Sequence, residues 1–504
     1  MDQDSRLLHK LTSYSATDAY PFHMPGHKRS HDIPGLEPFF DIDITEIDGF
    51  DNLHRAEGIL LEIQKQAAEL YRAKDAFISV NGSTCGVLAA MMSQIPRGDT
   101  VILGRGAHKS AYHGLYLQQL TPIYLQADTL PFQIPGAVAP GQIANAMDEH
   151  PEAKAVVLTS PTYEGLLLDV EKIAEEVHRR DGILIVDSAH GAHLGFAHCM
   201  EKNPVNLGAD LVIVSLHKTM PAMTQTALVL VGSDRVDVEN LKLHLGILQT
   251  SSPSYVLMAS IQESLLYAAK YGEEGLARMA ESREALTAAV RKQCKHVLVV
   301  DGQNDLGTRE KWDPGKLVIT TLRGEMTGPA IYQYLRQEHN LQLEMATGTY
   351  ALAMLSMMDK PEAYKRLLDA LVVLDRKIET NEITETLQGD DISDDEITLQ
   401  SNDPLLQDDM EKKDFPKTVV PLWKALNQTG TEIPLEKTIG KICGTFVGLY
   451  PPGIPMLVPG EEMDRQRYEE IKSCLKRGLH VQGLVVKQDG LYLKTIPENI
   501  DRKN

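Results

Sequence analysis

The stretch Leu211-Val212-Ile213-Val214-Ser215-Leu216-His217-Lys218-Thr219 decides the fold that we expect for this chain. Its first four residues are apolar and mostly β-branched, which predicts a strand that is buried on both faces. Open α/β sheets bind their ligands at the carboxyl ends of such strands. A lysine that is desolvated there can have its pKa lowered enough to act as an amine nucleophile. An ordinary surface lysine is the alternative, so other motifs must decide the role of Lys218.

Length and composition indicate a globular protein with a large core. The chain has 504 residues, of which 43% are hydrophobic and 24% are charged, as in soluble proteins of about three domains. The net charge of −20 argues against a nucleic-acid partner, because no basic stripe is present. The five cysteines are scattered and contain no C-x-x-C pair, so neither disulfides nor a metal site are indicated. No apolar run approaches the roughly 18 residues of a membrane span, and we expect a cytoplasmic protein.

Apolar strand patterns alternate with helical patterns over residues 51–285. This alternation is typical of an α/β fold in which helices wrap a mostly parallel sheet. Helices are predicted at about residues 57–72 and 170–180. Strands are predicted at residues 76–80, 101–103, 122–125, 155–159, 182–187, 211–214 and 227–231.

The rest of the chain divides by composition into four parts. Residues 1–50 are predicted to be irregular, and the loop PFHMPGHK at 21–28 is either a connector or an active-site wall. Residues 286–385 predict a smaller α+β domain, with strands at 296–300, 316–322, 342–346 and 350–357 and helices at 328–338 and 361–378. Residues 386–415 are dense in Asp and Glu and predict a solvated connector. Residues 416–504 form a C-terminal domain that includes a hairpin turning at Asp489-Gly490.

Three further features fall at the same sheet edge as Lys218. Asp187 ends the strand at 182–187, and His108 follows the strand at 101–103. Gly82-Ser83-Thr84 joins a strand to a helix, where free backbone N–H groups and hydroxyls suit a phosphate, although ordinary helix capping is the alternative. A lysine, a carboxylate, a phosphate cup and an aromatic ring are together what pyridoxal 5′-phosphate requires.

Several motifs then occur in order: PGHK at 25–28, DITE at 43–46, NGST at 81–84, HKS at 108–110, DSAHG at 187–191, SxHK at 215–218, and PGIP with PGE at 452–461. Together they resemble the Orn/Lys/Arg decarboxylase family of fold-type-I pyridoxal-phosphate enzymes, from about residue 20 to residue 495. The resemblance implies an aspartate-aminotransferase-like large domain, a small domain and a C-terminal family domain. It also implies a homodimer, or a dimer-based oligomer, with shared active sites. Because the loop that contains PGHK begins at residue 21, we do not expect the N-terminal wing of the larger family members.

Carried over by position, the resemblance also implies roles for individual residues. Lys218 would be the Schiff-base lysine, and Asp187 would pair with the pyridinium nitrogen of the cofactor. His108 would stack on the cofactor ring. The other cofactor-binding residues implied are Gly82, Ser83, Thr84, Ser215 and His217 at the phosphate, and Ala189 and His190 against the ring. The segment at 250–255 would reach the phosphate of the partner subunit, or is a plain Ser/Pro turn.

The function implied is α-decarboxylation of a basic amino acid to its amine and CO₂. Arginine is favoured, with agmatine as product, ahead of lysine and ornithine. Either His217 or Lys218 could supply the Cα proton, and Glu46 or Glu344 could meet the distal cation, unless each is an ordinary surface acid. An aminotransferase of the same fold and a non-catalytic pyridoxal-phosphate-binding regulatory protein are the alternatives.

Overall fold

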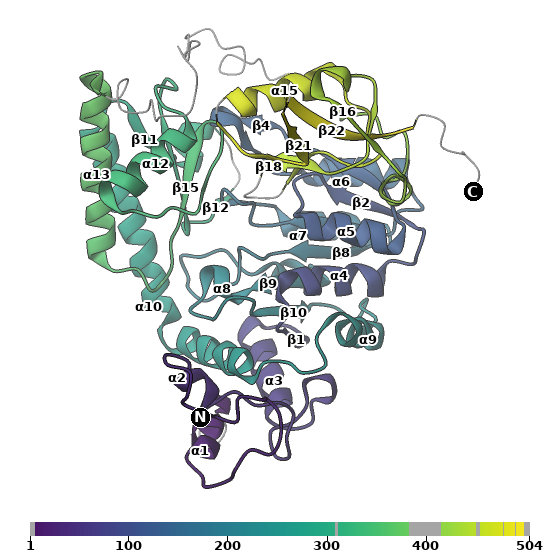
Figure 1. Ribbon diagram of the computed structural model, residues 1–504, viewed down its shortest axis with the longest axis vertical. Coiled ribbons are helices and arrows are strands. Elements are labelled where there is room, and N and C mark those ends of the chain that lie inside the picture. Colours follow the sequence, from purple (N-terminus) through teal and green to yellow (C-terminus); the bar gives the residue numbers. More distant parts are fainter. Residues whose placement is uncertain are drawn as a thin grey trace.

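The computed structural model describes residues 6–307, 311–382, 415–449, 454–476, 478–488 and 490–497. Its centre is a seven-stranded sheet in the order β1-β10-β9-β8-β6-β2-β3 (Figure 1). β10 is antiparallel to both of its neighbours, and the other strand pairs are parallel. The predicted mostly parallel sheet is therefore confirmed, and each strand begins within one residue of its predicted start. The strands are β1 (Asp75–Ser79), β2 (Thr100–Gly104), β3 (Thr121–Leu125), β6 (Ala155–Thr159), β8 (Ile183–Asp187), β9 (Leu211–Ser215) and β10 (Ala227–Val231).

Strand β9 contributes to two hydrophobic cores, one on each face of the sheet. Leu211 and Ile213 pack into one core, and the alternate side chains of the strand pack into the other, as the two-residue period of a strand requires. One face is covered by α4 (Gly82–Gln94), α5 (Lys109–Gln118) and α9 (Val238–Leu248). The other is covered by α3 (Ile59–Tyr71), α6 (Pro140–Glu149), α7 (Val170–Arg179) and α10 (Tyr255–Gln293). Burial on both faces explains why the strand is apolar without alternation.

A smaller layer follows, built on a four-stranded antiparallel sheet in the order β11-β13-β15-β14. Its elements are β11 (Val297–Val299), β13 (Lys316–Thr321), α12 (Gly328–His339), β14 (Met345–Ala346), β15 (Tyr350–Met354) and α13 (Pro361–Glu379). The 39-residue helix α10 packs on both the large domain and α13. The boundary that we predicted at residue 285 therefore falls inside one continuous helix.

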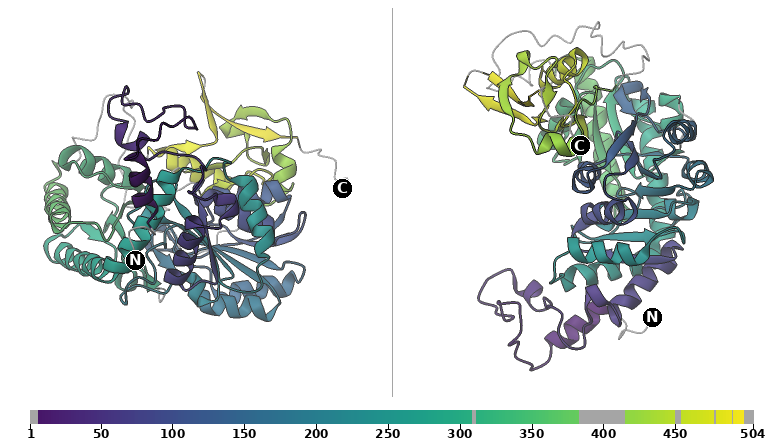
Figure 2. Two further views of the ribbon diagram at one scale, coloured as in Figure 1. Left: turned by 90° about the horizontal axis from the view of Figure 1, so that it is seen from below. Right: turned by 90° about the vertical axis from the view of Figure 1, so that its right-hand side faces the viewer.

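The prediction that residues 1–50 are irregular is wrong in part. The structure has helices α1 (Leu7–Ser15) and α2 (Glu37–Phe40) there. Leu7 and Leu11, one helical turn apart, are 0% and 1% exposed and pack against α10. No side chain caps the N-terminus of α1, so the usual sequence signal for a helix start is missing. Figure 2 shows the segment after α1 standing away from the body of the molecule.

The C-terminal region forms two small sheets and a helix. It contains α14 (Leu422–Leu426), β16 (Thr431–Pro434), β17 (Ile442–Cys443), β18 (Val447–Leu449), β19 (Pro455–Leu457), α15 (Arg465–Lys476), β20 (Val481–Gln482), β21 (Leu484–Lys487) and β22 (Gly490–Ile496). Strands β21 and β22 form the predicted hairpin, and Lys487 pairs with Gly490. Gly490, which we predicted in the turn, is thus the first residue of β22, and Asp489 lies outside the described residues. Of the predicted acidic connector at 386–415, all but Phe415 also lies outside them. Across the described ranges, none of the helices combines the length and apolarity that a membrane span requires.

One buried ion pair joins the C-terminal region to the large domain. The Arg105 guanidinium donates to both carboxylate oxygens of Glu461, at 2.8 and 2.9 Å. The backbone N–H of Val458 donates to the same carboxylate at 2.7 Å. The side chains of Arg105 and Glu461 are only 10% and 1% exposed. The glutamate of the PGE motif is therefore an anchor between domains.

This pair makes a prediction about stability. Glu461→Gln leaves the Arg105 charge buried without its counter-ion, and we expect it to cost about 3–5 kcal/mol of stability. The double variant Arg105→Met/Glu461→Met removes both charges, so it should lose less than either single change. Denaturant unfolding of Glu461→Gln, of the other single variant Arg105→Met, and of the double variant checks this. Losses that simply add in the double variant would contradict it.

Candidate active site

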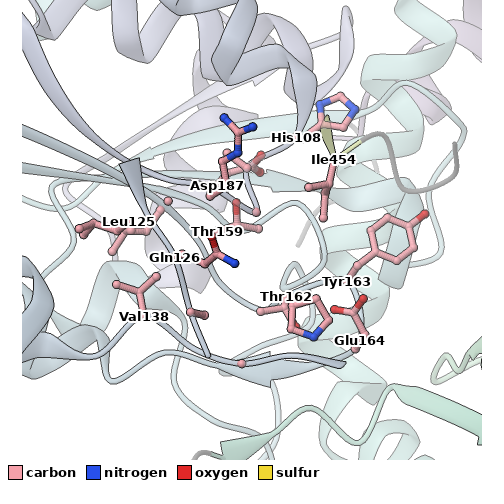
Figure 3. Close-up of a pocket in the computed structure, with 18 of the residues that line it drawn as sticks. His108, Leu125, Gln126, Val138, Thr159, Thr162, Tyr163, Glu164, Asp187 and Ile454 are labelled. Atoms are coloured by element: carbon pink, nitrogen blue, oxygen red, sulfur yellow. The ribbon is translucent and has the colours of Figure 1, made fainter. Parts of the chain in front are cut away.

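A cavity of about 350 Å³ opens at the carboxyl ends of the central strands and is bounded on one side by the C-terminal region (Figure 3). Six of the ten predicted cofactor-binding residues line it: Ser83, His108, Asp187, Ala189, His190 and Lys218. The remaining four, Gly82, Thr84, Ser215 and His217, belong to the same two segments but are not among the lining residues. The structure therefore brings the predicted cofactor-binding segments together around one space.

Lys218 lies in α8 (Leu216–Thr219), a single helical turn that follows β9 directly. Its Nζ lies 3.1 Å from Nε2 of His190. Burial lowers the pKa of Lys218, and the negative charges of Asp187 and Glu344 act in the opposite direction. A lowered pKa increases the share of neutral amine near neutral pH, which is the form that a nucleophile needs.

Asp187 is the last residue of β8 and pairs in register with Ile213 of β9. The residue is 7% exposed, and one carboxylate oxygen accepts a hydrogen bond from the Ala189 N–H at 3.1 Å. Burial raises the pKa of Asp187, and the charge of Lys218 opposes this. A buried carboxylate is most stable beside a cation, so this position suits a pyridinium nitrogen.

His108 presents a neutral ring to the cavity. It is the N-cap residue of α5, where its Nδ1 accepts a hydrogen bond from the Ser110 N–H at 3.2 Å. Burial lowers the pKa of His108 to about 4, and the charges of Lys218 and Lys109 lower it further. A flat uncharged ring is suited to stacking on another aromatic ring.

The predicted phosphate cup lies at the start of α4. Gly82 is the first residue of this helix, with φ of +76°, and the Asn81 side chain does not cap it. Ser83 lines the cavity, whereas Thr84 is exposed on this chain. The hydroxyls of Ser215 and Thr159 are buried and have no hydrogen-bond partner among the described residues. Donors left unpaired beside a helix N-terminus fit a bound phosphate.

His217 does not line the cavity and contacts the backbone near β10 instead. Its Nδ1 lies 3.1 Å from the Thr226 carbonyl, and burial lowers its pKa. Glu46, one of the two candidates for the distal cation, is exposed and does not line the cavity. Glu344, the other candidate, accepts a hydrogen bond from the Tyr163 hydroxyl at 2.8 Å. It therefore lies close to the site without being one of its lining residues.

Two predicted segments make no contact with the cavity of their own chain. Neither the loop at 21–28 nor the segment at 250–255 contributes a lining residue. In the second segment, the Thr250 carbonyl is bonded to His54 at 2.8 Å, and Ser254 caps α10. The predicted role of the loop at 21–28 as an active-site wall stays a prediction. So does the predicted role of the segment at 250–255 at the phosphate of the partner subunit.

Sequence reasoning missed several lining residues. Thr159 ends β6 at the same sheet edge, so the rule that found Asp187 could also have found it. Glu164, buried and bonded to the Tyr350 hydroxyl at 2.7 Å, gives no comparable signal. The C-terminal region contributes Ile454 and Pro455, which belong to the PGIP motif but were given no role, and Met456, Arg467 and Glu470, which gave no signal.

A strand-end lysine, a neighbouring buried carboxylate, a stacking ring and a phosphate cup on a mostly parallel sheet define the class of fold-type-I pyridoxal-phosphate enzymes. The family model described as Orn/Lys/Arg decarboxylase, major domain, matches residues 5–360, and the one described as Orn/Lys/Arg decarboxylase, C-terminal domain, matches residues 408–494. This chain belongs to the Orn/Lys/Arg decarboxylase family and is a pyridoxal-phosphate-dependent decarboxylase. The second match begins inside the segment that we interpreted as an acidic connector.

Individual relatives agree with this assignment. YaaO of Bacillus subtilis (strain 168) is 30% identical over 490 residues, covering 94% of this chain and 95% of the relative. An arginine decarboxylase of Bacillus anthracis is 28% identical over 492 residues, covering 95% of each protein. Among solved structures, lysine decarboxylase A of Pseudomonas aeruginosa superposes with a TM-score of 0.81 at 20% identity, covering 98% of this chain and 80% of the other. This last likeness concerns the fold.

Proposed function

We propose that this enzyme removes the α-carboxyl group of arginine, giving agmatine and CO₂. The observation that carries the proposal is the cavity, in which Lys218 and Asp187 share one space with the carboxylates of Asp128 and Glu470, the second of which is paired with Arg467. Such carboxylates suit a substrate whose far end is a cation. The match to an arginine decarboxylase along 95% of both chains supports the choice of arginine over lysine.

The proposed roles follow from the contacts of each residue. Lys218 would hold the aldehyde carbon of the cofactor, and Asp187 would keep positive charge at its pyridine nitrogen. Bound pyridoxal phosphate would supply the electron sink for the bond that breaks between Cα and the carboxylate. Ser83, Ser215 and the N-terminus of α4 would hold the phosphate.

Proton delivery falls to Lys218 rather than to His217. Only Lys218 lines the cavity, and the Nδ1 of His217 is directed to the Thr226 carbonyl. The C-terminal region would help to exclude water, because Ile454 and Met456 close one side of the cavity. Excluding water strengthens every charge interaction within the site.

The substrate assignment is tested by incubating the full-length enzyme with arginine, lysine and ornithine in parallel, with the cofactor added. We expect CO₂ and agmatine from arginine, with the highest kcat/KM of the three. Lys218→Ala should lower this activity by about 10³-fold or more. A keto acid without CO₂ would instead identify an aminotransferase. A bound-cofactor spectrum without any amine product would indicate a regulatory protein.

The phosphate contact is tested with a matched pair of serines. Ser215→Ala should weaken cofactor binding about tenfold or more, because a hydrogen bond to a charged group is worth about 1.5–3 kcal/mol. Ser188→Ala is the control, since its hydroxyl is also buried and unpartnered among the described residues but is not assigned to the phosphate. Cofactor titration of the two variants gives the affinities. Equal affinities would remove Ser215 from the phosphate site.

We also propose that the enzyme is a homodimer in which a second copy covers the N-terminal segment. Tyr20, Phe22 and Met24 are 65%, 90% and 61% exposed in this chain. Large apolar side chains gathered on one projecting segment are unusual on a surface that faces water. A second copy would bury them. The segments at 21–28 and 250–255 of this chain would then lie toward the active site of that second copy.

Phe22→Ser should therefore weaken dimerisation, because it removes the most exposed apolar side chain of the segment. Val486→Ser is a control of similar kind, since Val486 is 80% exposed on the C-terminal hairpin. Sedimentation over a range of protein concentrations would show a shift toward monomer for the first variant alone. An unchanged distribution in Phe22→Ser would place the interface elsewhere.

A further inference from the structure

A second buried lysine lies next to the proposed nucleophile. Lys316 is the first residue of β13 and is 0% exposed. Its Nζ lies 2.8 Å from Nδ1 of His190, while Nε2 of the same ring lies 3.1 Å from Nζ of Lys218. One imidazole thus bridges two amines, one from the small domain and one from the large domain.

The fold leaves a defined space for the Lys316 side chain. Gly165 has φ of +114°, and a Cβ built there would lie 2.8 Å from Cγ of Lys316. The Lys316 carbonyl accepts a hydrogen bond from Nε of Arg283 at 3.2 Å, which fixes the start of the strand. Lysine is almost never fully buried unless its amine is paired. Its partner here is a residue of the active site.

The protonation state of His190 limits the charge that Lys218 and Lys316 can carry together. His190 is 4% exposed, and burial, followed by the charges of Lys316 and Lys218, holds its pKa well below the usual range. The ring is therefore neutral, with one N–H donor and one acceptor nitrogen. Because each nitrogen faces an amine, one of the two amines must accept the N–H and must itself be neutral. At most one of the two lysines can be charged while both contacts persist.

Charged and titratable groups surround this bridge from several elements. Asp313, Glu344 and Glu164 favour a charged Lys316, whereas burial and Lys218 disfavour it and lower its pKa to about 8. Asp313 is itself paired with His193 at 2.8 Å. On the other side, Asp187 and Glu344 favour a charged Lys218, and His108 lies nearby. The surroundings therefore support a positive charge on either amine.

We propose that Lys316 is a positioning residue that exchanges a proton with Lys218 through His190. In the forward direction the Lys218 ammonium gives a proton to Nε2, and the proton on Nδ1 passes to the neutral amine of Lys316. Lys218 is left as a neutral nucleophile, His190 changes tautomer, and Lys316 carries the charge. The reverse transfer returns a proton to Lys218. This step rests on the proposed function of Lys218 as the amine that binds the cofactor.

The test measures the pKa of Lys218 directly. The full-length chain is freed of cofactor and treated with a trace of acetic anhydride at a series of pH values, and acetylation of Lys218 is quantified by mass spectrometry. Only the neutral amine reacts, so the midpoint of the profile is the pKa of Lys218. Lys316→Met removes the competing charge and should raise that pKa by about one unit. Labelling at a fixed pH below the midpoint should then fall about tenfold.

Two further variants keep the test decisive. Lys316→Gln retains a polar group near Nδ1 without a charge and should shift the profile upward in the same way. Arg283→Met is the control, because Arg283 is a half-buried cation that bonds the Lys316 and Val300 carbonyls rather than His190. It should lower thermal stability and leave the Lys218 profile unchanged. Unchanged profiles in both Lys316 variants, or an equal shift in Arg283→Met, would overturn the proposal.

The labelling needs neither substrate nor turnover, so it is independent of the proposed reaction. If the profile shifts as expected but no basic amino acid is decarboxylated, the exchange stands and the proposed function falls. If arginine is decarboxylated and the profile does not shift, the proposed function stands and the proton exchange is ruled out. In the active enzyme, the acid limb of the kcat pH profile should also move upward in Lys316→Met.

Discussion

The parallel pairing of β8 with β9 is the constraint on which the site depends. The interior residues of both strands are fully buried, because helices cover the sheet on each face. Polar groups can therefore enter only where the strands end, and there Asp187 and Ser215 lie on adjacent strands. The short helix that follows β9 then adds Lys218 at the same edge. Backbone hydrogen bonding thus sets the relative position of the carboxylate and the amine before any ligand binds.

Burial also sets the chemistry of that edge. Desolvation lowers the pKa values of Lys218, His190 and His108 and raises that of Asp187. Each group is then sensitive to a single neighbouring charge, because charge interactions are stronger away from water. A site of this kind can change the charge of one lysine by moving a proton over one imidazole ring.

The cavity is completed by parts of the chain that are distant in sequence. Ile454 and Glu470 of the C-terminal region line it. Lys316 and Tyr350 of the small domain support it from behind, through their contacts with the lining residues His190 and Glu164. The Arg105–Glu461 ion pair holds that last region against the large domain. The assembled space is therefore a property of the arrangement of the domains, and no single domain contains it.

The sequence by itself determined the central sheet and the core of the site. Apolar runs that end in polar residues are local signals, and they predicted the starts of the seven strands and the meeting of Asp187 with Lys218. The uncapped helix α1 gave no such signal, and neither did the contact of His190 with Lys316, which are separated by 126 positions. Only the tertiary structure decided these features. Periodicity reports which face of an element is buried, but it does not report which distant side chain lies against that face.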